Sequence, residues 1–110
     1  MKISKISTYT LSSEVREHFG YYIVKVETDS GIYGLGESGI WYWGGSISKA
    51  VERLSEILIG EDPLSTEKLW QYMFRGSFFP ADGVYSAAIS AIDIALWDIK
   101  GKAFNMPVYK

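Results

Sequence analysis

The chain has 110 residues, of which 47% are hydrophobic and 15% aromatic, and its formal net charge is −2. This length and composition predict one globular domain with a modest core and argue against disorder. The mixed charges form no basic stripe for nucleic acid, no apolar run approaches the roughly 20 residues of a membrane span, and the absence of cysteine excludes disulfides and thiolate chemistry.

Three segments in the first third of the chain have the pattern of β-strands. Residues 3–11 are rich in β-branched side chains, and residues 21–28 alternate apolar and charged side chains. The sequence Asp29-Ser30-Gly31 predicts a tight turn, because glycine tolerates a positive φ, and residues 32–36 then form the third strand. Residues 12–20 are polar and mixed, so we expect a loop there.

Helical spacing of apolar residues follows the strands. It predicts a helix ending near Gly60, a second helix from Ser65 to about Arg75, and a long last helix over residues 84–103. The predicted fold class is therefore α+β, a three-stranded antiparallel β-meander followed by three or more helices.

The last helix is apolar nearly all round, which indicates burial on more than one side. One small sheet and two short helices are not expected to wrap it completely. We therefore expect a missing neighbour, with Ile89, Ile94 and Trp97 left without a partner. A chain with such a patch is expected to hide it by self-association, most simply as a homo-oligomer with two-fold symmetry.

The sequence Gly34-Leu35-Gly36-Glu37-Ser38-Gly39 matches the G-x-G-x-x-G pattern of dinucleotide sites. That pattern needs a helix to begin at once, so that the helix N-terminus meets the pyrophosphate. Here residues 40–45 intervene, and Glu37 would repel a phosphate. We interpret these glycines as marking a bent strand end.

His18 is the only histidine, and a lone histidine in a polar loop is usually exposed to solvent, although a substrate contact is the alternative. The carboxylates have no shared face that predicts a metal site, and no catalytic set can be assembled. Trp41, Tyr42 and Trp43 stand in a glycine-bounded segment. They form either a binding surface or an anchor of the segment on the domain's own core, and the residues alone leave both readings open.

Residues 88–102, with the sequence AISAIDIALWDIKGK, are followed by Pro107 and Val108. This pattern resembles the signature of the mandelate racemase and muconate lactonizing enzymes, within the enolase superfamily. The order of the earlier segments agrees with that family over the whole chain. Many members have glycine where this chain has Asn105, but asparagine also tolerates the left-handed conformation that a helix stop requires.

The resemblance implies that residues 1–110 are an N-terminal capping domain and that a (β/α)-barrel domain of the same protein carries the catalytic bases and the Mg²⁺ ligands. The parent enzyme is then a sugar-acid dehydratase or racemase that abstracts a proton α to the carboxylate of a small-molecule substrate. This chain alone is expected to be inactive and to hold no metal. In that family two segments close over the barrel mouth, and by position they correspond here to residues 12–19 and 39–45. The implied substrate-contacting residues are His18, Phe19, Trp41, Tyr42 and Trp43.

The compartment and an alternative class of function can also be addressed from the sequence. No apolar segment follows the N-terminal residues as in a signal peptide, and a cysteine-free chain fits a reducing compartment, so we expect a cytoplasmic protein. A different class of function also remains open, namely a stand-alone, non-catalytic interaction domain that buries its last helix against a partner chain.

Overall fold

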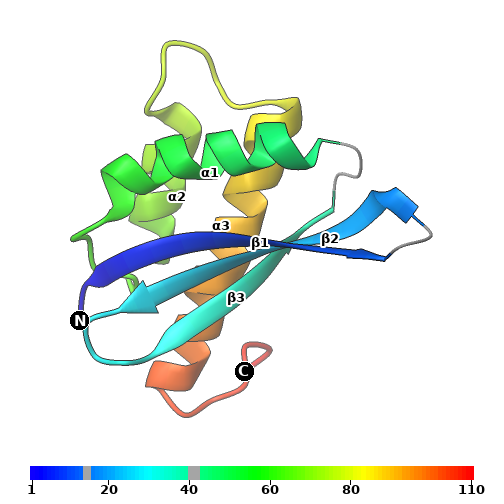
Figure 1. Cartoon of the computed structure of the whole chain (residues 1–110). Coiled ribbons are helices and arrows are strands. Elements are labelled where there is room, and N and C mark those ends of the chain that lie inside the picture. Colours follow the sequence, from blue (N-terminus) through cyan, green and yellow to red (C-terminus); the bar gives the residue numbers. More distant parts are fainter. Residues whose placement is uncertain (14–15, 40–42) are drawn as a thin grey trace.

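The computed structural model describes residues 1–13, 16–39 and 43–110, and for residues 12, 13 and 16–20 it describes the backbone alone. Within these residues the chain first forms one antiparallel sheet in the order β1-β2-β3, made of β1 (Ile3–Ser13), β2 (Arg16–Thr28) and β3 (Tyr33–Ser38). The helices of the described part follow, α1 (Gly44–Leu58), α2 (Thr66–Arg75) and α3 (Gly83–Ala103). The predicted α+β class and the order of elements are confirmed (Figure 1).

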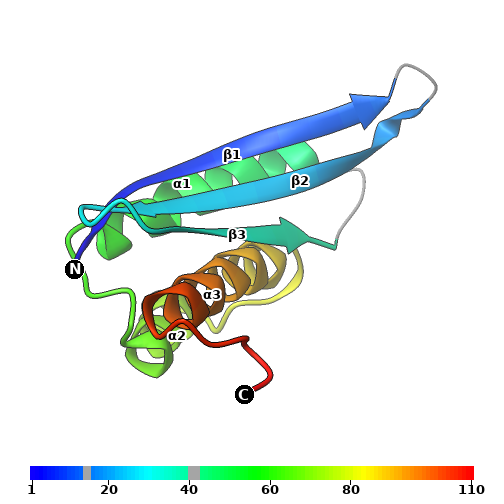
Figure 2. The ribbon, with the colours of Figure 1, turned by 90° about the horizontal axis from the view of Figure 1, so that it is seen from below.

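The helices cover one face of the sheet. Helix α3 packs on β3 and β2, α1 packs on β1 and α3, and α2 packs on α3. Figure 2 shows α2 and α3 beneath the sheet and α1 behind β1 and β2, with the C-terminus on the side of α3. The core lies between these layers and consists of Ile3, Val24, Val26, Ile47, Val51, Leu54, Leu58, Leu69, Met73, Ala88, Ile89, Ala91, Ile92, Ala95, Leu96 and Ile99.

The first hairpin is longer than the sequence predicted. We expected a loop over residues 12–20, but β1 continues to Ser13 and β2 begins at Arg16, and these two residues pair across the hairpin. The prediction was wrong because it relied on apolar alternation, whereas the backbone hydrogen bonds of a hairpin need no apolar face. The turn after β2 was predicted correctly, and Gly31 adopts a φ of 86°.

The Gly34-x-Gly36 pair serves close packing and not a bend. Both residues lie within the regular pairing of β2 and β3. A Cβ atom added to Gly34 would lie 1.9 Å from the carbonyl oxygen of Ala95, and one added to Gly36 would lie 1.8 Å from that of Ala91. Our interpretation of a bent strand end is therefore replaced: glycine is needed here because the backbone of α3 rests directly on β3.

Helix α3 also uses two polar residues of the family-like signature to hold the edge of the sheet. The Asp98 carboxylate accepts a hydrogen bond from the Leu35 backbone N–H at 3.0 Å and one from the Lys102 ammonium at 2.7 Å. Lys102 also donates to the Tyr33 backbone carbonyl at 2.8 Å. Two backbone groups of the free edge of β3 are thereby hydrogen-bonded to side chains of α3, which hinders pairing of this part of the edge with another strand.

The prediction for the exposed side of α3 is correct in part. Ile94 and Trp97 are 48% and 42% exposed, but Ile89 is only 2% exposed and belongs to the core. An all-round apolar helix has no single stripe, so its sequence does not reveal which direction faces solvent. At the helix end Asn105 adopts a φ of 49°, as expected for the residue in the left-handed position.

Candidate functional site

Two segments leave the sheet at the same end. Strands β1 and β3 run in the same direction on either side of β2, so the end of β1, the start of β2 and the end of β3 lie together. The first segment is the tip of the β1–β2 hairpin, and the second joins β3 to α1 (Figure 1). We call the region formed by residues 12–19 and 39–45 the lid end. The antiparallel topology alone brings these distant parts of the sequence to one place.

Of the five predicted contact residues, the structure describes one with its side chain and two by their backbone alone. His18 and Phe19 belong to β2 by their backbone, and their side chains lie outside the described part of the structure. Trp41 and Tyr42 lie outside the described residues altogether. Trp43 is described: its carbonyl accepts a hydrogen bond from the Ile47 N–H at 2.8 Å, and its side chain is 55% exposed at the start of α1. Trp43 therefore does not anchor the segment in the core.

The second segment returns to the domain over Tyr22. A Cβ atom added to Gly44 would lie 2.5 Å from Cε2 of the Tyr22 ring, so glycine lets α1 begin directly over this aromatic side chain. Beside Tyr22 in the register lies Ser38, which is 3% exposed. Within the described residues its hydroxyl has no hydrogen-bond partner. The base of the lid end thus contains the partly buried Tyr22 ring and one buried hydroxyl that contributes little to stability.

Catalytic chemistry is not assembled in the described part of the chain. Among these residues no three His, Asp or Glu side chains converge as metal ligands would. One carboxyl group has a perturbed pKa: burial raises the pKa of Asp93 above its ordinary value, and the nearby charge of Glu67 raises it further. Asp93 lies in a cleft of about 280 Å³ between α2 and α3, together with Thr66, Trp70 and Trp97, and no nucleophile–base pair faces it.

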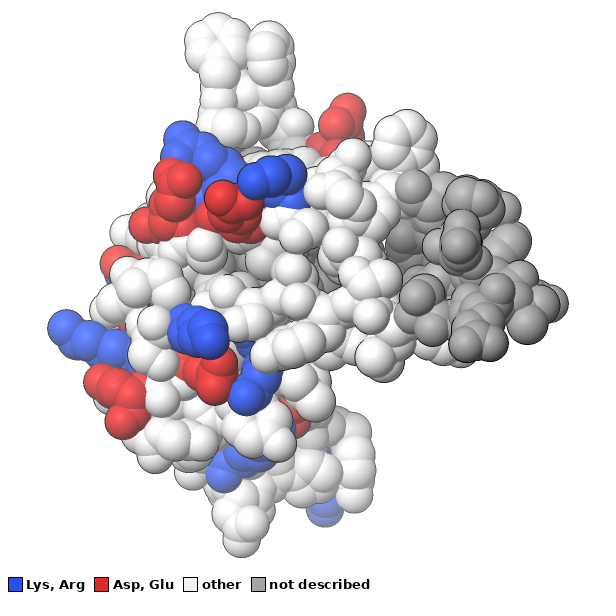
Figure 3. Space-filling model, in the orientation of Figure 1, with Lys and Arg blue, Asp and Glu red and all other residues white. Residues whose placement is uncertain are grey.

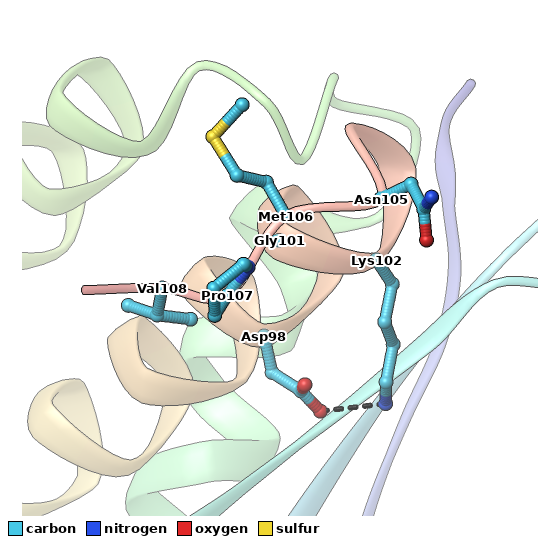
Figure 4. Close-up of a pocket in the computed structure, with 7 residues that line it drawn as sticks. All are labelled: Asp98, Gly101, Lys102, Asn105, Met106, Pro107 and Val108. Carbon is cyan, nitrogen blue, oxygen red and sulfur yellow. Dashed lines mark hydrogen bonds and ion pairs between the residues drawn. The ribbon is translucent and has the colours of Figure 1, made fainter. Parts of the chain in front are cut away.

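The C-terminal segment forms a hollow against the end of α3. Figure 4 shows Asp98 and Lys102 on one wall of this hollow and Pro107 and Val108 on the other. Its volume is about 360 Å³. A second, apolar hollow of about 180 Å³ adjoins it, lined among others by Trp97, Phe104 and Met106. Several apolar side chains of the second hollow are exposed, since Trp97, Phe104 and Val108 are 42%, 58% and 56% accessible.

None of the described helices is long and apolar enough to cross a membrane. The sequence analysis proposed aromatic contact residues at the lid end, which stays a prediction, and it missed the close approach of Gly44 to the ring of Tyr22. The only available signal was the glycine pair at 44 and 45, which does not reveal which ring lies beneath it.

Comparison with known proteins places these features in context. The family model described as "Mandelate racemase / muconate lactonizing enzyme, N-terminal domain" matches residues 3–110. A D-galactonate dehydratase of Cronobacter sakazakii is 43% identical over the whole of this chain. The chain spans 27% of that relative's length.

Solved structures agree with this. The 3,6-anhydro-D-galactonate cycloisomerase of Zobellia galactanivorans superposes with a TM-score of 0.87 and 42% identity, covering 98% of this chain and 30% of that one. An enolase of Agrobacterium radiobacter, whose structure holds Na and L-malate, superposes with a TM-score of 0.90 and 31% identity, covering 99% of this chain and 27% of that one. The chain thus corresponds to roughly the first quarter of longer enzymes.

Proposed function

Because this chain belongs to the mandelate racemase/muconate lactonizing enzyme family, as its N-terminal domain, we propose that it caps the active site of a longer enzyme and helps to choose its substrate. The observation that carries the proposal is the convergence of two segments at one end of the sheet, with the exposed indole of Trp43 in one of them. Domain 1–110 would supply the lid, and the following (β/α)-barrel domain would supply the reacting groups.

The lid end is suited to exclude water from a site beside it. Large aromatic side chains cover much area at small entropic cost, and we propose His18, Phe19, Trp41, Tyr42 and Trp43 as the residues that contact substrate. Abstraction of a proton α to a carboxylate places negative charge on the substrate. Electrostatic stabilisation of that charge is stronger when water is excluded, so lid closure assists a reaction whose bases lie elsewhere.

A sugar acid is the substrate class that the relatives support. One relative is named for dehydration of D-galactonate and another for isomerisation of 3,6-anhydro-D-galactonate. We propose that the parent enzyme dehydrates an aldonate: the proton leaves the carbon next to the carboxylate, and hydroxide leaves the adjacent carbon.

The parent enzyme is proposed to use Mg²⁺, which stabilises a carboxylate-derived anion when it is bound. The structure of a related enolase holds Na and L-malate, which supports binding of a cation and of a carboxylate by an enzyme of this kind. The described residues of this chain do not fit as its ligands, because they bring no three His, Asp or Glu side chains together. The residues that hold the ion are therefore proposed for the barrel domain.

The barrel domain is also the proposed partner of the apolar surface at the end of α3. Trp97 and Phe104 are exposed there, and Ile94 is exposed further back on the same helix. We further propose a homo-oligomeric, cytoplasmic enzyme. The alternative of a stand-alone interaction domain is not favoured, since the relatives are longer enzymes of which this chain matches one part.

The test uses the full-length protein and substitutions Trp41→Ala, Tyr42→Ala and Trp43→Ala. Turnover of D-galactonate and a panel of other aldonates is followed through the 2-keto-3-deoxy product. We expect kcat/KM to fall about tenfold or more, equivalent to about 1.4 kcal/mol, for at least one variant, with relative preferences among aldonates changed. The melting temperature should shift by only about 2 °C, because Trp43 contributes no buried core.

The matched control is Phe79→Ala, which removes an exposed aromatic side chain that is 74% accessible and lies outside the lid end. It should leave the kinetics unchanged. Unchanged kinetics in all three lid variants, together with lowered melting temperatures, would show that the aromatic residues only anchor the segment.

A further inference from the structure

The cleft between α2 and α3 combines two indole rings with two carboxyl groups. Helix α2 contributes Glu67 and Trp70, α3 contributes Asp93 and Trp97, and Thr66 completes the lining. Residues 93 and 97 are one helical turn apart, so their side chains lie on the same face of α3. The volume of about 280 Å³ lies below the roughly 300–1,000 Å³ of small-molecule sites, so one inserted side chain fits the cleft better than a free ligand.

The carboxylate of Asp93 lacks a cation. Asp93 is partly buried, and it forms no hydrogen bond or ion pair with the residues that the structure describes. Burial and the negative charge of Glu67 both raise the pKa of Asp93, so its surroundings disfavour the ionised form. Other acidic side chains are placed differently: Figure 3 shows acidic and basic groups side by side over the sheet and α1, where Glu27 pairs with Lys25 at 3.0 Å. A partly buried carboxylate is unfavourable unless a cation reaches it.

Lys100 stands on the same helix but does not supply that cation. Its ammonium donates a hydrogen bond to the Thr66 hydroxyl at 3.2 Å and lies 4.8 Å from the centre of the Trp97 ring. Asp93 is seven residues earlier, which is about 10 Å along the helix axis. The ring of Trp97 thus already contacts one cation at its end of the cleft, while the part beside Asp93 has none among the described residues.

We propose that this cleft receives the guanidinium group of an arginine from the domain that follows Lys110, and that this group pairs with Asp93 against the indole rings of Trp70 and Trp97. Arginine fits better than lysine, because its planar guanidinium stacks on aromatic rings, binds a carboxylate through two parallel hydrogen bonds and is more weakly hydrated than an ammonium. Glu67 adds a second negative charge to the lining. The inference rests on the following domain of the proposed function, but not on the proposed reaction or on the lid end.

The following domain is the occupant because the cleft adjoins the surface from which the chain continues. Trp97 lines both this cleft and the apolar hollow that Pro107 and Val108 form with the end of α3. Figure 2 shows α2 and α3 beneath the sheet, with the C-terminus on the side of α3. This chain spans 27% of the length of a dehydratase relative, so most of such an enzyme lies beyond this domain. A domain that covers the hollow covers Trp97 and thereby reaches Asp93.

One substitution with opposite effects in two proteins tests the proposal. In the 110-residue chain Asp93→Asn should raise the melting temperature at pH 7, because it removes a partly buried charge. In the full-length protein the same substitution leaves a buried guanidinium without its counter-charge and should lower the melting temperature by at least about 3 °C. A raised or unchanged melting temperature of full-length Asp93→Asn would overturn the proposal.

Two further variants separate the charge of Asp93 from its packing. The matched control Asp82→Asn makes the same change at an exposed residue before α3, where asparagine caps a helix as well as aspartate does, and it should shift either melting temperature by less than about 1 °C. Asp93→Glu keeps the charge and should recover most of what Asp93→Asn loses in the full-length protein. Equal losses in both would show that packing alone is involved and would contradict the proposal. If Asp93→Asn does not fold, a folded Asp93→Glu protein still shows that the charge is required.

Double-mutant cycles in the full-length protein identify the arginine. Each arginine of the following domain is replaced by methionine, alone and together with Asp93→Asn. For the partner of Asp93, the double variant should lose little more melting temperature than the more damaging single variant, whereas distant arginines should give additive losses. If no arginine couples to Asp93, the proposal is wrong. Turnover is not measured in these experiments, so their failure leaves the proposed role of the lid end untouched.

Discussion

Substitution of Gly36 by alanine should severely destabilise the domain. The added methyl group would lie 1.8 Å from the Ala91 carbonyl oxygen and 3.0 Å from the Ala95 backbone nitrogen. Ordinary contact between such atoms needs about 3.2 Å or more, so β3 and α3 would have to separate by about 1.4 Å. Both obstructing atoms are backbone, so rotation of a side chain does not relieve the clash.

Separation of the two elements has several costs at once. It opens the tightest layer of the core and stretches the hydrogen bond from Leu35 to Asp98, which is 3.0 Å long. Overpacking of a core commonly costs about 1–3 kcal/mol, and the loss of this contact adds about 1 kcal/mol. Alanine lowers the conformational entropy of the unfolded chain relative to glycine, and this offsets the destabilisation by less than about 1 kcal/mol. With overpacking at the upper end of its range, because both obstructing atoms are backbone, we expect a net loss of about 3 kcal/mol.

The assay is unfolding of the 110-residue chain in urea and by heat, followed by far-ultraviolet circular dichroism. A loss of about 3 kcal/mol lowers the melting temperature of a domain of this size by about 12 °C or more. Gly45→Ala is the matched control, because nothing lies within 4 Å of its added Cβ atom and it stands in a helix, where alanine is favoured. If Gly36→Ala unfolds within about 0.5 kcal/mol of the wild type, the direct contact of α3 with β3 is refuted.

Three further changes have definite expected outcomes. Asp98→Leu should cost about 1 kcal/mol in urea unfolding and increase aggregation measured by light scattering, because the edge of β3 loses its partner at Leu35; unchanged scattering would contradict this. Ser38→Ala should change stability by less than about 0.5 kcal/mol or raise it, and a loss above 1 kcal/mol would reveal a partner of the hydroxyl. Burial and the charge of Glu67 raise the pKa of Asp93, so the native state binds the proton of this carboxyl group more tightly than the unfolded state does. The free energy of unfolding therefore falls as pH rises from the ordinary pKa of 3.8 through the raised pKa. The gain in melting temperature from Asp93→Asn should therefore be larger at pH 7 than near pH 3.5, and an equal gain at both would exclude this linkage.

Local patterns predicted the elements because each element buries one periodic face. Residues 21–28 alternate with period two, and Val24 and Val26 are fully buried. Leu54 and Leu58 lie on the buried side of α1, at the helical spacing that predicted this helix. The hairpin extension beyond Leu11 carries no such face in its sequence, so the same reasoning placed a loop where strands continue.

Non-local contacts account for what the sequence analysis missed. The glycines at 34 and 36 are explained only by a helix that begins nearly fifty residues later, at Gly83. Asp98 and Lys102 have the spacing of an ordinary ion pair on a helix surface, but their additional partners are backbone groups of β3. Neither partner can be inferred from spacing within α3, because a pattern within one element does not identify the element against which it packs.

The lid end illustrates which part of a site is predictable from sequence. In an antiparallel meander the first and third strands run the same way, so a prediction of three strands already places residues 12–19 and 39–45 at one end. The direction of each aromatic side chain depends on contacts that no periodicity encodes. Trp43 is exposed although it directly precedes α1, a helix with a buried face, and the neighbouring Gly44 lies against the ring of Tyr22. Since Trp43 contributes no buried core, exchange of this residue can alter what the lid contacts while the fold persists. The close contact of α3 with β3 contributes to stability, whereas for the lid end we propose a role in substrate choice.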